Sequence, residues 1–495
     1  MASNDAWFGG WLPVRASQRL WLVAVLALLV VPLALGVQRW ERTFGVPYQD
    51  DWAISVQQTS DDGYIVAGSN KRDTTQDRLW LLRLDTMGNL LWERRYCPTG
   101  CDFTRAYSVV QTRDEGFVAA GSIGAPDTNP YHNDFTYVIR FDSLGDSLWA
   151  KRFGRWSHAH DIEQTRDGGY VVAGRTSLYS GGVEWPFLYV IRLDSLGDSL
   201  WSRTLGDSGY CAEATAVKET PDGGFIVAGD TDIGGDCRAW LVRLDSAGNL
   251  KWTRTISTGV HLVEVTVNSD GGFTAAGSTS LYGAGLSDYY LVRTDSLGRS
   301  LWFRTYGGAN TDGCMGMARC PNDGGYVLAG QTWSFGAGCD DAWVVRTDSL
   351  GFERWMQTYG GSDWDDAWAV EQTSDEGFIV VGTTVDDAYV IKTDGNGSAA
   401  IDDNGESQQP EESLPLIRAP GLVEGQLTCQ YFQLVGGRAR IELFDASGRR
   451  LSRVELGCHN AGWHDLQIPV APPAGARFLR LLTNGQSATA KFIVP

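Results

Sequence analysis

Large aromatic side chains and paired carboxylates gather in the segments between the apolar stretches of this sequence. Aromatic rings beside carboxylates suit stacking on sugar rings or contact with a protein surface. Neighbouring carboxylates suit calcium binding or, with a raised pKa, acid–base chemistry. The aromatic candidates are Trp52, Tyr131, Trp156, Tyr179, Trp185, Tyr282, Trp333, Phe335 and Trp364. The acidic candidates are Asp340, Asp341, Asp365, Asp366, Asp386 and Asp387. Each set has a plainer interpretation, namely aromatic packing within loops and acids solvated at a surface.

Histidine and cysteine give weaker signals. The sequence has six histidines, and no His/Cys set in it has the spacing of a zinc site. His158 and His160 are the one close pair, and at positions i and i+2 of a strand they would share a face that could hold a metal. No third ligand is evident, so ordinary histidines at the rim of the fold are the alternative. The sequence also has no nucleophile elbow and no phosphate-binding loop.

Nine cysteines predict disulfide bonds in a chain that is exported. Two of the expected pairs occupy equivalent places in two repeats, with separations of 26 and 25 residues. The four predicted bonds join Cys211 to Cys237, Cys314 to Cys339, Cys97 to Cys101, and Cys429 to Cys458. Cys320 is left over, and because it replaces a threonine that ends equivalent strands, we expect a buried, unreactive thiol there.

A sevenfold internal repeat positions these residues. In each copy a turn is followed by an apolar strand that closes on a glycine, at Gly68, Gly121, Gly174, Gly229, Gly277, Gly330 and Gly382. The steps between these glycines are 53, 53, 55, 48, 53 and 52 residues. A period of about fifty residues with short strands is typical of a β-propeller, because solenoid rungs are shorter.

Each repeat divides into four strands, A to D. In the fourth repeat we predict strands over 212–220, 224–229, 239–245 and 250–255, separated by turns rich in Asp and Gly. Antiparallel succession places the D-to-A and B-to-C loops at one end of the fold. Because the aromatic and acidic candidates lie in those loops, that end is the presumed functional face.

A tryptophan marks the last strand of each repeat, but one of the seven is out of place. Trp40 precedes the first A strand, whereas the seventh repeat stops near Gly397 after its C strand. We therefore predict that residues 40–44 supply strand D of the last blade and close the ring, which removes exposed edges. The seven tryptophans are Trp40, Trp92, Trp149, Trp201, Trp252, Trp302 and Trp355.

Tryptophans and basic residues that recur in every repeat are expected to serve the scaffold. The tryptophans should fill gaps between neighbouring blades. The basic residues near the end of strand C should make polar contacts between blades, since charged groups near a core are usually paired. They are Arg83, Arg140, Arg192, Arg243, Arg293, Arg346 and Lys392.

The repeat resembles known families. Its Gly-Gly-aromatic-apolar strand with a later tryptophan resembles kelch-type propellers, and the phrase from Asp62 to Gly68, Asp-Gly-Tyr-Ile-Val-Ala-Gly, is similar to bacterial delta-sixty repeats. The resemblance covers residues 40–397 and implies an all-β, seven-bladed propeller of four-stranded antiparallel blades. Such folds host many unrelated activities, so the resemblance implies no ligand.

The two ends of the chain predict export. Residues 1–36, with Arg15 and Arg19 before an apolar run, are predicted to be a signal peptide, and an uncleaved anchor is the alternative. Residues 398–420 are predicted to be an acidic flexible linker, and residues 421–495 an Ig-like β-sandwich.

The C-terminal segment also resembles a known family. The phrase Ile-Glu-Leu-Phe-Asp-Ala-Ser-Gly-Arg that ends at Arg449 resembles the C-terminal sorting domain of type IX secretion, although no basic residue follows Lys491. The resemblance implies the type IX secretion machinery as a partner, and a secreted or outer-surface location reached through the general secretory pathway. An ordinary Ig-like accessory domain is the alternative.

Composition narrows the function. A formal net charge of -19 would repel nucleic-acid phosphates and anionic membranes, so we expect no nucleic-acid partner. We expect a monomer that binds a glycan or protein outside the cell without chemistry, and no cofactor unless the acids bind calcium. An extracellular propeller hydrolase or lyase is one alternative, and a non-catalytic surface structural protein is the other.

Overall fold

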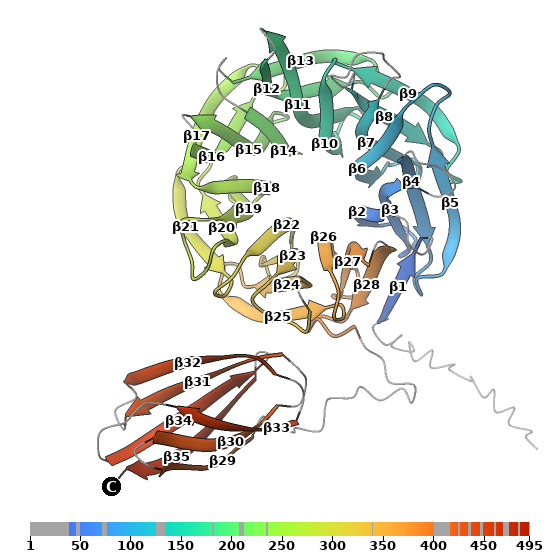
Figure 1. Cartoon of the computed structure of the whole chain (residues 1–495). Coiled ribbons are helices and arrows are strands. Elements are labelled where there is room, and N and C mark those ends of the chain that lie inside the picture. The colour runs from blue at the N-terminus through green and yellow to red at the C-terminus, as the bar shows by residue number, and fades with distance from the viewer. Residues whose placement is uncertain are drawn as a thin grey trace, which may run out of the picture. The chain divides into compact units, whose positions relative to one another are not determined.

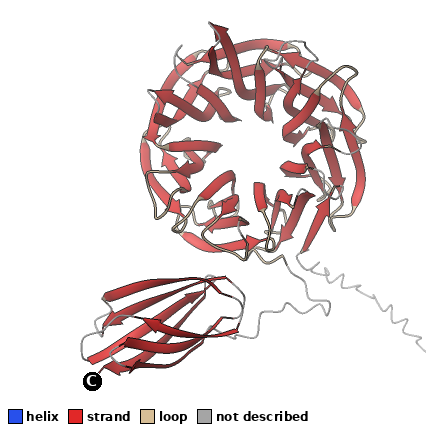
Figure 2. Ribbon diagram, viewed as in Figure 1, coloured by secondary structure: helices blue, strands red, loops and turns tan. Residues whose placement is uncertain are grey.

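The computed structural model is built from strands and short loops, and in the part of the chain that it describes there is no helix (Figure 2). It describes residues 39–45, 50–71, 77–124, 134–180, 183–206, 212–233, 236–338, 340–385, 387–399, 416–423, 426–433, 437–445, 449–459, 462–468, 475–483 and 486–494. The predicted signal segment, 1–36, and most of the predicted linker lie outside these ranges.

Residues 40–393 form seven four-stranded antiparallel sheets that stand as blades around a central opening (Figure 1). Blade 1 contains β2 (Asp51–Gln58), β3 (Tyr64–Asn70), β4 (Arg78–Leu84) and β5 (Leu90–Tyr96). Blade 2 contains β6 (Phe103–Gln111), β7 (Phe117–Gly124), β8 (Asp134–Phe141) and β9 (Ser147–Phe153). Blade 3 contains β10 (Ser157–Gln164), β11 (Tyr170–Ser180), β12 (Val183–Leu193) and β13 (Ser199–Leu205).

The other four blades repeat this plan. Blade 4 contains β14 (Ala212–Glu219), β15 (Phe225–Ile233), β16 (Asp236–Leu244) and β17 (Leu250–Thr258). Blade 5 contains β18 (Val260–Val267), β19 (Phe273–Thr279), β20 (Asp288–Thr294) and β21 (Ser300–Tyr306). Blade 6 contains β22 (Asp312–Arg319), β23 (Tyr326–Thr332), β24 (Asp341–Thr347) and β25 (Glu353–Tyr359). Blade 7 contains β26 (Asp365–Gln372), β27 (Phe378–Thr384), β28 (Asp387–Thr393) and, from the other end of the chain, β1 (Trp40–Phe44).

The N-terminal strand completes blade 7, as the orphan tryptophan predicted. β1 pairs with β28 antiparallel, with Trp40 opposite Lys392 (Figure 1). In blade 6 the equivalent residues, Trp355 and Arg346, are also opposite each other. β1 therefore pairs with β28 in the same register in which β25 pairs with β24 in blade 6.

The tryptophans pack between blades, which confirms the prediction. Trp92 of blade 1 meets Phe117 of blade 2 edge to face, with ring centroids 5.9 Å apart. Trp40 meets Tyr64 of blade 1 in the same way at 5.8 Å. A Cβ on Gly88, whose φ is +75°, would collide with the Trp40 ring, so the turn after strand C needs glycine there.

Each basic residue of strand C pairs with an acid of its own blade, which corrects the prediction of contacts between blades in part. Arg140 also bonds between blades as predicted, because its Nε donates to Tyr170 Oη of blade 3 at 3.2 Å. In blade 6, Arg346 Nη2 donates to Asp323 Oδ1 at 2.6 Å and Arg346 Nη1 donates to the Tyr326 carbonyl at 3.2 Å. Strand C ends beside the start of strand B, so its guanidinium reaches the turn between strands A and B. The seven pairs are Arg83–Asp61, Arg140–Asp114, Arg192–Asp167, Arg243–Asp222, Arg293–Asp270, Arg346–Asp323 and Lys392–Asp375.

Every strand A contains a register shift at its midpoint. In β10 the extra residue is His160, between Ala159 and Asp161, so the strict alternation that would place both histidines on one face is interrupted. His158 Nε2 lies 3.4 Å from Asp134 Oδ2, whereas the His160 ring stacks on Tyr107. Neither histidine belongs to a group of three metal-ligating side chains in the described residues.

The C-terminal segment forms two further sheets. Its strands are β29 (Leu416–Val423), β30 (Gln426–Gln433), β31 (Gly437–Asp445), β32 (Arg450–His459), β33 (Gly462–Ile468), β34 (Gly475–Thr483) and β35 (Gln486–Val494). One sheet has the order β29-β30-β33 and the other β32-β31-β34-β35. Buried Ile441 and Leu443 lie opposite Leu481 and Leu479 in the second sheet, which gives it an apolar face. β29 begins inside the segment predicted to be linker, where the sequence has no strand-like alternation.

Candidate ligand-binding site

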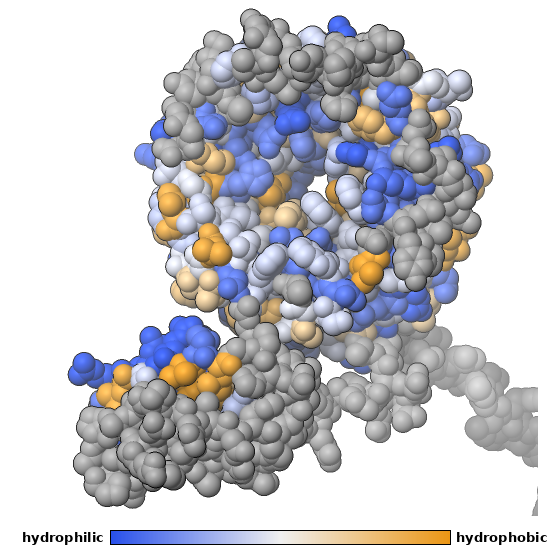
Figure 3. Space-filling view, viewed as in Figure 1, coloured by the Kyte–Doolittle hydropathy of each residue, from blue (hydrophilic) through white to orange (hydrophobic). Residues whose placement is uncertain are grey.

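The B-to-C and D-to-A loops meet at one end of the ring, here called the loop end. Backbone hydrogen bonds join the start of strand C in one blade to the chain entering strand A of the next. The Cys237 carbonyl accepts from Gly259 N at 2.8 Å, and the Asp340 carbonyl accepts from Asp365 N at 3.0 Å. Hydrophilic residues predominate around the central opening on the face shown in Figure 3.

At the loop end, a side chain from the start of strand C faces one from the start of the next strand A. Between blades 1 and 2 the pair is Asp77 and Arg105, with Arg105 Nε donating to Asp77 Oδ2 at 2.6 Å. Between blades 2 and 3 the pair is Asp134 and His158. An acid therefore meets a basic group at both junctions, and each carboxylate has a partner that can offset its charge.

The junction between blades 6 and 7 breaks this pattern, because the charge that acts on Asp340 from the next strand A is that of another acid, Asp366. The Asp340 side chain is 2 % exposed, and the Oδ1 atoms of both residues are buried without a hydrogen-bond donor among the described residues. Burial, followed by the charge of Asp366, raises the pKa of Asp340 to about 7. Burial and the charge of Asp365 raise the pKa of Asp366. The two Oδ1 atoms therefore give this acidic junction unused hydrogen-bond acceptor capacity.

Two exposed tryptophans stand beside the acidic junction. Trp333 hydrogen-bonds to Asp340 through its side chain, and Trp364 pairs with Asp340 through an isolated backbone bridge. The two rings are 42 % and 59 % exposed, and their centroids lie 5.7 Å apart at an interplanar angle of 85°. The structure thus brings together four of the residues that the sequence singled out: two carboxylates and two aromatic rings.

Two of the other acidic candidates accept hydrogen bonds from loop amides, although Asp365 Oδ1 is also buried without a donor among the described residues. Gly338 N donates to Asp341 Oδ2 at 3.0 Å, and Gly361 N donates to Asp365 Oδ2 at 2.7 Å. Asp387 lies in β28, and Asp386 lies outside the described residues. None of the described acids predicted to bind calcium belongs to a group of three ligand atoms within 4.8 Å of one another.

The other aromatic candidates occupy separate places around the ring. Tyr282 packs against Phe303, and Phe335 packs against Trp343, as expected for loop packing. The three remaining candidates with described side chains are Trp52, which is 37 % exposed, and the half-buried Trp156 and Trp185. Tyr131 and the side chain of Tyr179 lie outside the described part.

Of the predicted disulfide bonds, the structure contains the one between Cys97 and Cys101. Cys237 and Cys314 are free thiols in it, which differs from the bonds predicted to Cys211 and Cys339. Cys314 is 1 % exposed, its Sγ lies 3.6 Å from the Gly316 carbonyl, and it packs within the core of its blade junction. Residues 211 and 339 and the side chains of residues 429 and 458 lie outside the described part.

The leftover cysteine is buried, as predicted. Cys320 is 0 % exposed and free, and burial raises the pKa of its thiol to about 12. It therefore stays protonated at neutral pH, which suits a packing role rather than a nucleophile.

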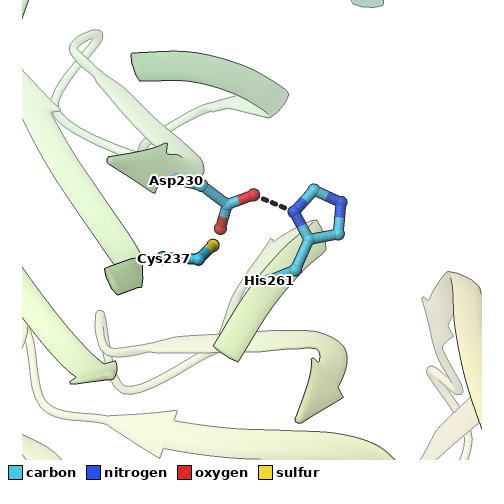
Figure 4. A group of neighbouring side chains, drawn as sticks. All are labelled: Asp230, Cys237 and His261. Atoms are coloured by element: carbon cyan, nitrogen blue, oxygen red, sulfur yellow. Dashed lines mark ion pairs between the residues drawn. The ribbon is translucent and has the colours of Figure 1, made fainter. Parts of the chain in front are cut away.

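The junction between blades 4 and 5 holds a cluster that the sequence did not predict (Figure 4). The ligand atoms of Asp230, Cys237 and His261 all lie within 4.8 Å of one another. Figure 4 shows the Asp230 carboxylate directed at His261 Nδ1, with the Cys237 sulfur beside the same carboxylate. Burial lowers the pKa of His261, but hydrogen bonds to Asp230 and Cys237 raise it to about 10. The three residues lie 7 and 24 positions apart in the sequence, and aligning the repeats on their closing glycines is the signal that would have grouped them.

A third cluster, in the inner strands, is internally paired. Lys218 Nζ lies 2.9 Å from Asp161 Oδ2 and 3.2 Å from Glu264 Oε1, so one lysine links the first strands of blades 3, 4 and 5. This cluster joins blades and offers less unused hydrogen-bonding capacity than the acidic junction.

The acidic junction predicts a distinctive pH dependence. The pKa of Asp340 is raised from 3.8 to about 7 by folding, so between these values the folded state binds more protons and stability falls as pH rises. The Asp340→Asn variant lacks this loss of stability, so the difference between its melting temperature and that of the wild type should grow from about pH 4 to about pH 7.

Thermal unfolding followed by circular dichroism measures the difference, and Asp85→Asn is the opposite-sign control. Burial raises the pKa of Asp85, but hydrogen bonds from Asn89 and Met87 lower it overall, so that variant should lose stability relative to wild type as pH rises. A difference between Asp340→Asn and wild type that does not change with pH would contradict the raised pKa.

In the described part of the chain, no helix has the length and apolarity needed to cross a membrane.

Comparison with known proteins gives likenesses among solved structures alone. No family model and no curated protein matches the chain. A protein of unknown function from Bacteroides caccae is 11 % identical with a TM-score of 0.37, over 57 % of this chain and 90 % of that one. A protein of unknown function from Dyadobacter fermentans is 10 % identical with a TM-score of 0.42, over 71 % and 99 %. Drosophila Plexin A in complex with Semaphorin 1b is 8 % identical with a TM-score of 0.42, over 72 % and 88 %. At these values the likenesses assign neither a family nor a ligand.

Proposed function

We propose that the ring is a closed seven-bladed propeller of kelch-like or delta-sixty type that binds a glycan outside the cell, with the acidic junction as its site. The observation that carries the proposal is the pair of exposed rings, Trp333 and Trp364, beside Asp340 and Asp366, whose Oδ1 atoms have no hydrogen-bond donor among the described residues.

The chemistry of these four side chains fits a sugar better than an apolar ligand. The C–H face of a pyranose stacks on an indole ring, and its hydroxyl groups donate to carboxylate oxygens. A carboxyl with a pKa near 7 also serves as acceptor or donor near neutral pH, so it can pair with a hydroxyl in either direction. A neutral sugar also avoids the repulsion that a net charge of -19 would impose on an anionic ligand.

A glycoside hydrolase is the second candidate function. Two carboxyl groups that face each other, one with a pKa of about 7, are the groups that such enzymes use as acid and nucleophile or base. Release of reducing ends from the bound glycan, lost in Asp366→Asn, would favour this candidate over binding alone.

Screening the purified full chain on a glycan array tests the binding proposal. For the best ligand, Trp364→Ala should raise Kd about 30-fold, which corresponds to about 2 kcal/mol for a central aromatic contact. The matched control is Trp52→Ala, which removes an exposed tryptophan of strand A from a different junction. Trp52→Ala should leave Kd within about twofold of the wild-type value, because substitutions at the surface outside a binding contact have small effects.

No binding to any glycan, or equal losses in the two variants, would contradict the proposal. Binding to a protein with the same dependence on Trp364 would replace the glycan as the ligand class.

We also propose that the protein is exported. The support is the signal-like segment 1–36, together with the resemblance of residues 421–495 to type IX sorting domains, for which an Ig-like arrangement of the two C-terminal sheets is expected. Export through the general secretory pathway and the type IX machinery would place the glycan-binding end outside the cell.

A further inference from the structure

The cluster at the junction of blades 4 and 5 combines three donor types. Asp230 lies on β15 and Cys237 on β16 of blade 4, and His261 lies on β18 of blade 5. A carboxylate oxygen, a thiolate sulfur and an imidazole nitrogen within 4.8 Å of one another can surround a single cation.

We propose that Asp230, Cys237 and His261 bind a divalent cation of the zinc class. The inference goes beyond the proposed glycan site, which lies at a different junction.

The donor set selects the metal. Thiolate and imidazole ligands favour zinc and neighbouring transition metals, whereas calcium and magnesium take oxygen ligands alone. Zinc binds sulfur at about 2.3 Å and nitrogen or oxygen at about 2.0–2.2 Å, which puts ligand atoms within about 4 Å of one another in a tetrahedral site. The observed cluster reaches that geometry when the direct contact between Asp230 Oδ2 and His261 Nδ1 opens to admit the ion.

The backbone already orients two of the three ligands. Asp230 Oδ1 accepts from Leu262 N at 2.9 Å, which leaves Oδ2 facing His261 Nδ1. The Cys237 carbonyl accepts from Gly259 N at 2.8 Å, so the thiol and the imidazole are held on chains that are bonded together. Such supporting hydrogen bonds fix the orientation of ligands in metal sites.

Exposure suits a site that a metal can enter. Asp230 is 7 % exposed, whereas Cys237 is exposed and the His261 side chain is 48 % exposed. Solvent therefore reaches the sulfur and nitrogen side of the cluster, where a water or a ligand group could complete a fourth position.

A second carboxylate lies beside the cluster. Glu213 is directly opposite Asp230 on the neighbouring strand, and its charge is partly offset by Arg175, whose Nη1 lies 3.8 Å from Glu213 Oε2. At the two equivalent junctions described above, a basic group meets an acid and no sulfur is present. The junction between blades 4 and 5 therefore carries three side chains that can bind a metal, whereas those two junctions carry one acid and one basic group.

Cobalt(II) titration of the reduced full chain tests the proposal, because a cobalt–thiolate bond adds a charge-transfer absorption in the near ultraviolet. We expect one cobalt per chain, displacement by zinc, and an affinity that rises with pH because ligands must lose protons. Cys237→Ser should abolish the charge-transfer band. Asp230→Asn and His261→Gln should each weaken binding at least about tenfold.

His158→Gln is the matched control, because His158 also pairs with an acid at a blade junction but has no cysteine beside it. It should leave the band and the affinity unchanged. Far-ultraviolet circular dichroism shows that each variant is folded before it is titrated.

Three results would overturn the proposal: no thiolate band in the wild-type protein, an affinity unchanged by all three substitutions, or peptide mapping that finds Cys237 bonded to Cys211 in the protein as purified. The glycan screen is unaffected by any of them, so the two proposals fail separately.

Discussion

Replacing Trp40 by alanine is expected to lower the free energy of unfolding by about 3–5 kcal/mol, as for other large aromatic side chains removed from a core. Trp40 is 5 % exposed, stacks edge to face on Tyr64 and donates from Nε1 to the Thr86 carbonyl at 3.1 Å. Because β1 alone covers the edge of β28, loss of its anchor also exposes a strand edge. Urea unfolding of the full chain measures the change.

Trp355→Ala is the control for ring closure. Trp355 occupies the equivalent place in blade 6, where it packs on Phe378 and donates from Nε1 to the Gly395 carbonyl at 3.0 Å. If closure by β1 makes an ordinary junction, the two variants should lose similar stability. A loss of less than about 1 kcal/mol for Trp40→Ala, the size of an average substitution, would contradict closure.

Replacing Arg346 by methionine is expected to lower the free energy of unfolding by about 1.5–3 kcal/mol, the size of a hydrogen bond to a charged group. The Arg346 side chain is 6 % exposed and donates both to Asp323 and to the Tyr326 carbonyl. Methionine fills the space but removes both of these hydrogen bonds, while Asp323 keeps Arg354 Nη1 at 2.6 Å and Gly325 N at 3.0 Å as donors.

Arg346→Lys is the control, and blade 7 supplies the reason. There Lys392, with a side chain 1 % exposed, donates to Asp375 at 2.9 Å and to the Thr393 carbonyl at 2.9 Å. The lysine variant should therefore keep more of the stability than the methionine variant, since a lysine already fills this place once in the chain. Equal losses of stability in the lysine and methionine variants would contradict this expectation, because they would show that an ammonium group cannot replace the guanidinium group of Arg346.

The cost of Arg346→Met should shrink in acid. Burial raises the pKa of Asp323, but hydrogen bonds from Arg346 and the nearby guanidinium charges lower it below its usual value. A carboxyl group whose pKa is lowered by folding stabilises the folded state above its unfolded pKa, and this stabilisation is lost as pH falls. The difference in the free energy of unfolding between the variant and the wild type should therefore narrow below about pH 4.

Features contained within one repeat could be predicted from the sequence. The Asp-Gly turns, the apolar strand B and the tryptophan of strand D recur at each step, so strand order, the orphan Trp40 and its place beside β28 followed from counting alone. The partners of the basic residues could not be predicted by counting, because the contact of Arg346 with Asp323 depends on where strand C ends beside the A–B turn.

Features built between repeats could not be predicted in the same way. The sequence identified Trp333, Trp364, Asp340 and Asp366 by residue type, but it gave no reason to separate them from Tyr282 or Asp341. The distinction depends on the register of the strands. Asp340 interacts with the charge of Asp366 across a junction between blades, whereas Asp341 accepts a hydrogen bond from the amide of Gly338 in the loop. The register shift in strand A further prevents a simple period-two count from placing residues such as His160.

A crystal structure of the protein with the best glycan from the array tests most directly whether the junction between blades 6 and 7, where two acids meet, binds the ligand. We predict a sugar ring stacked on Trp364 or Trp333, with a hydroxyl within hydrogen-bond distance of Asp340 or Asp366. Sugar density at another junction, with the acidic junction left unchanged, would contradict the account.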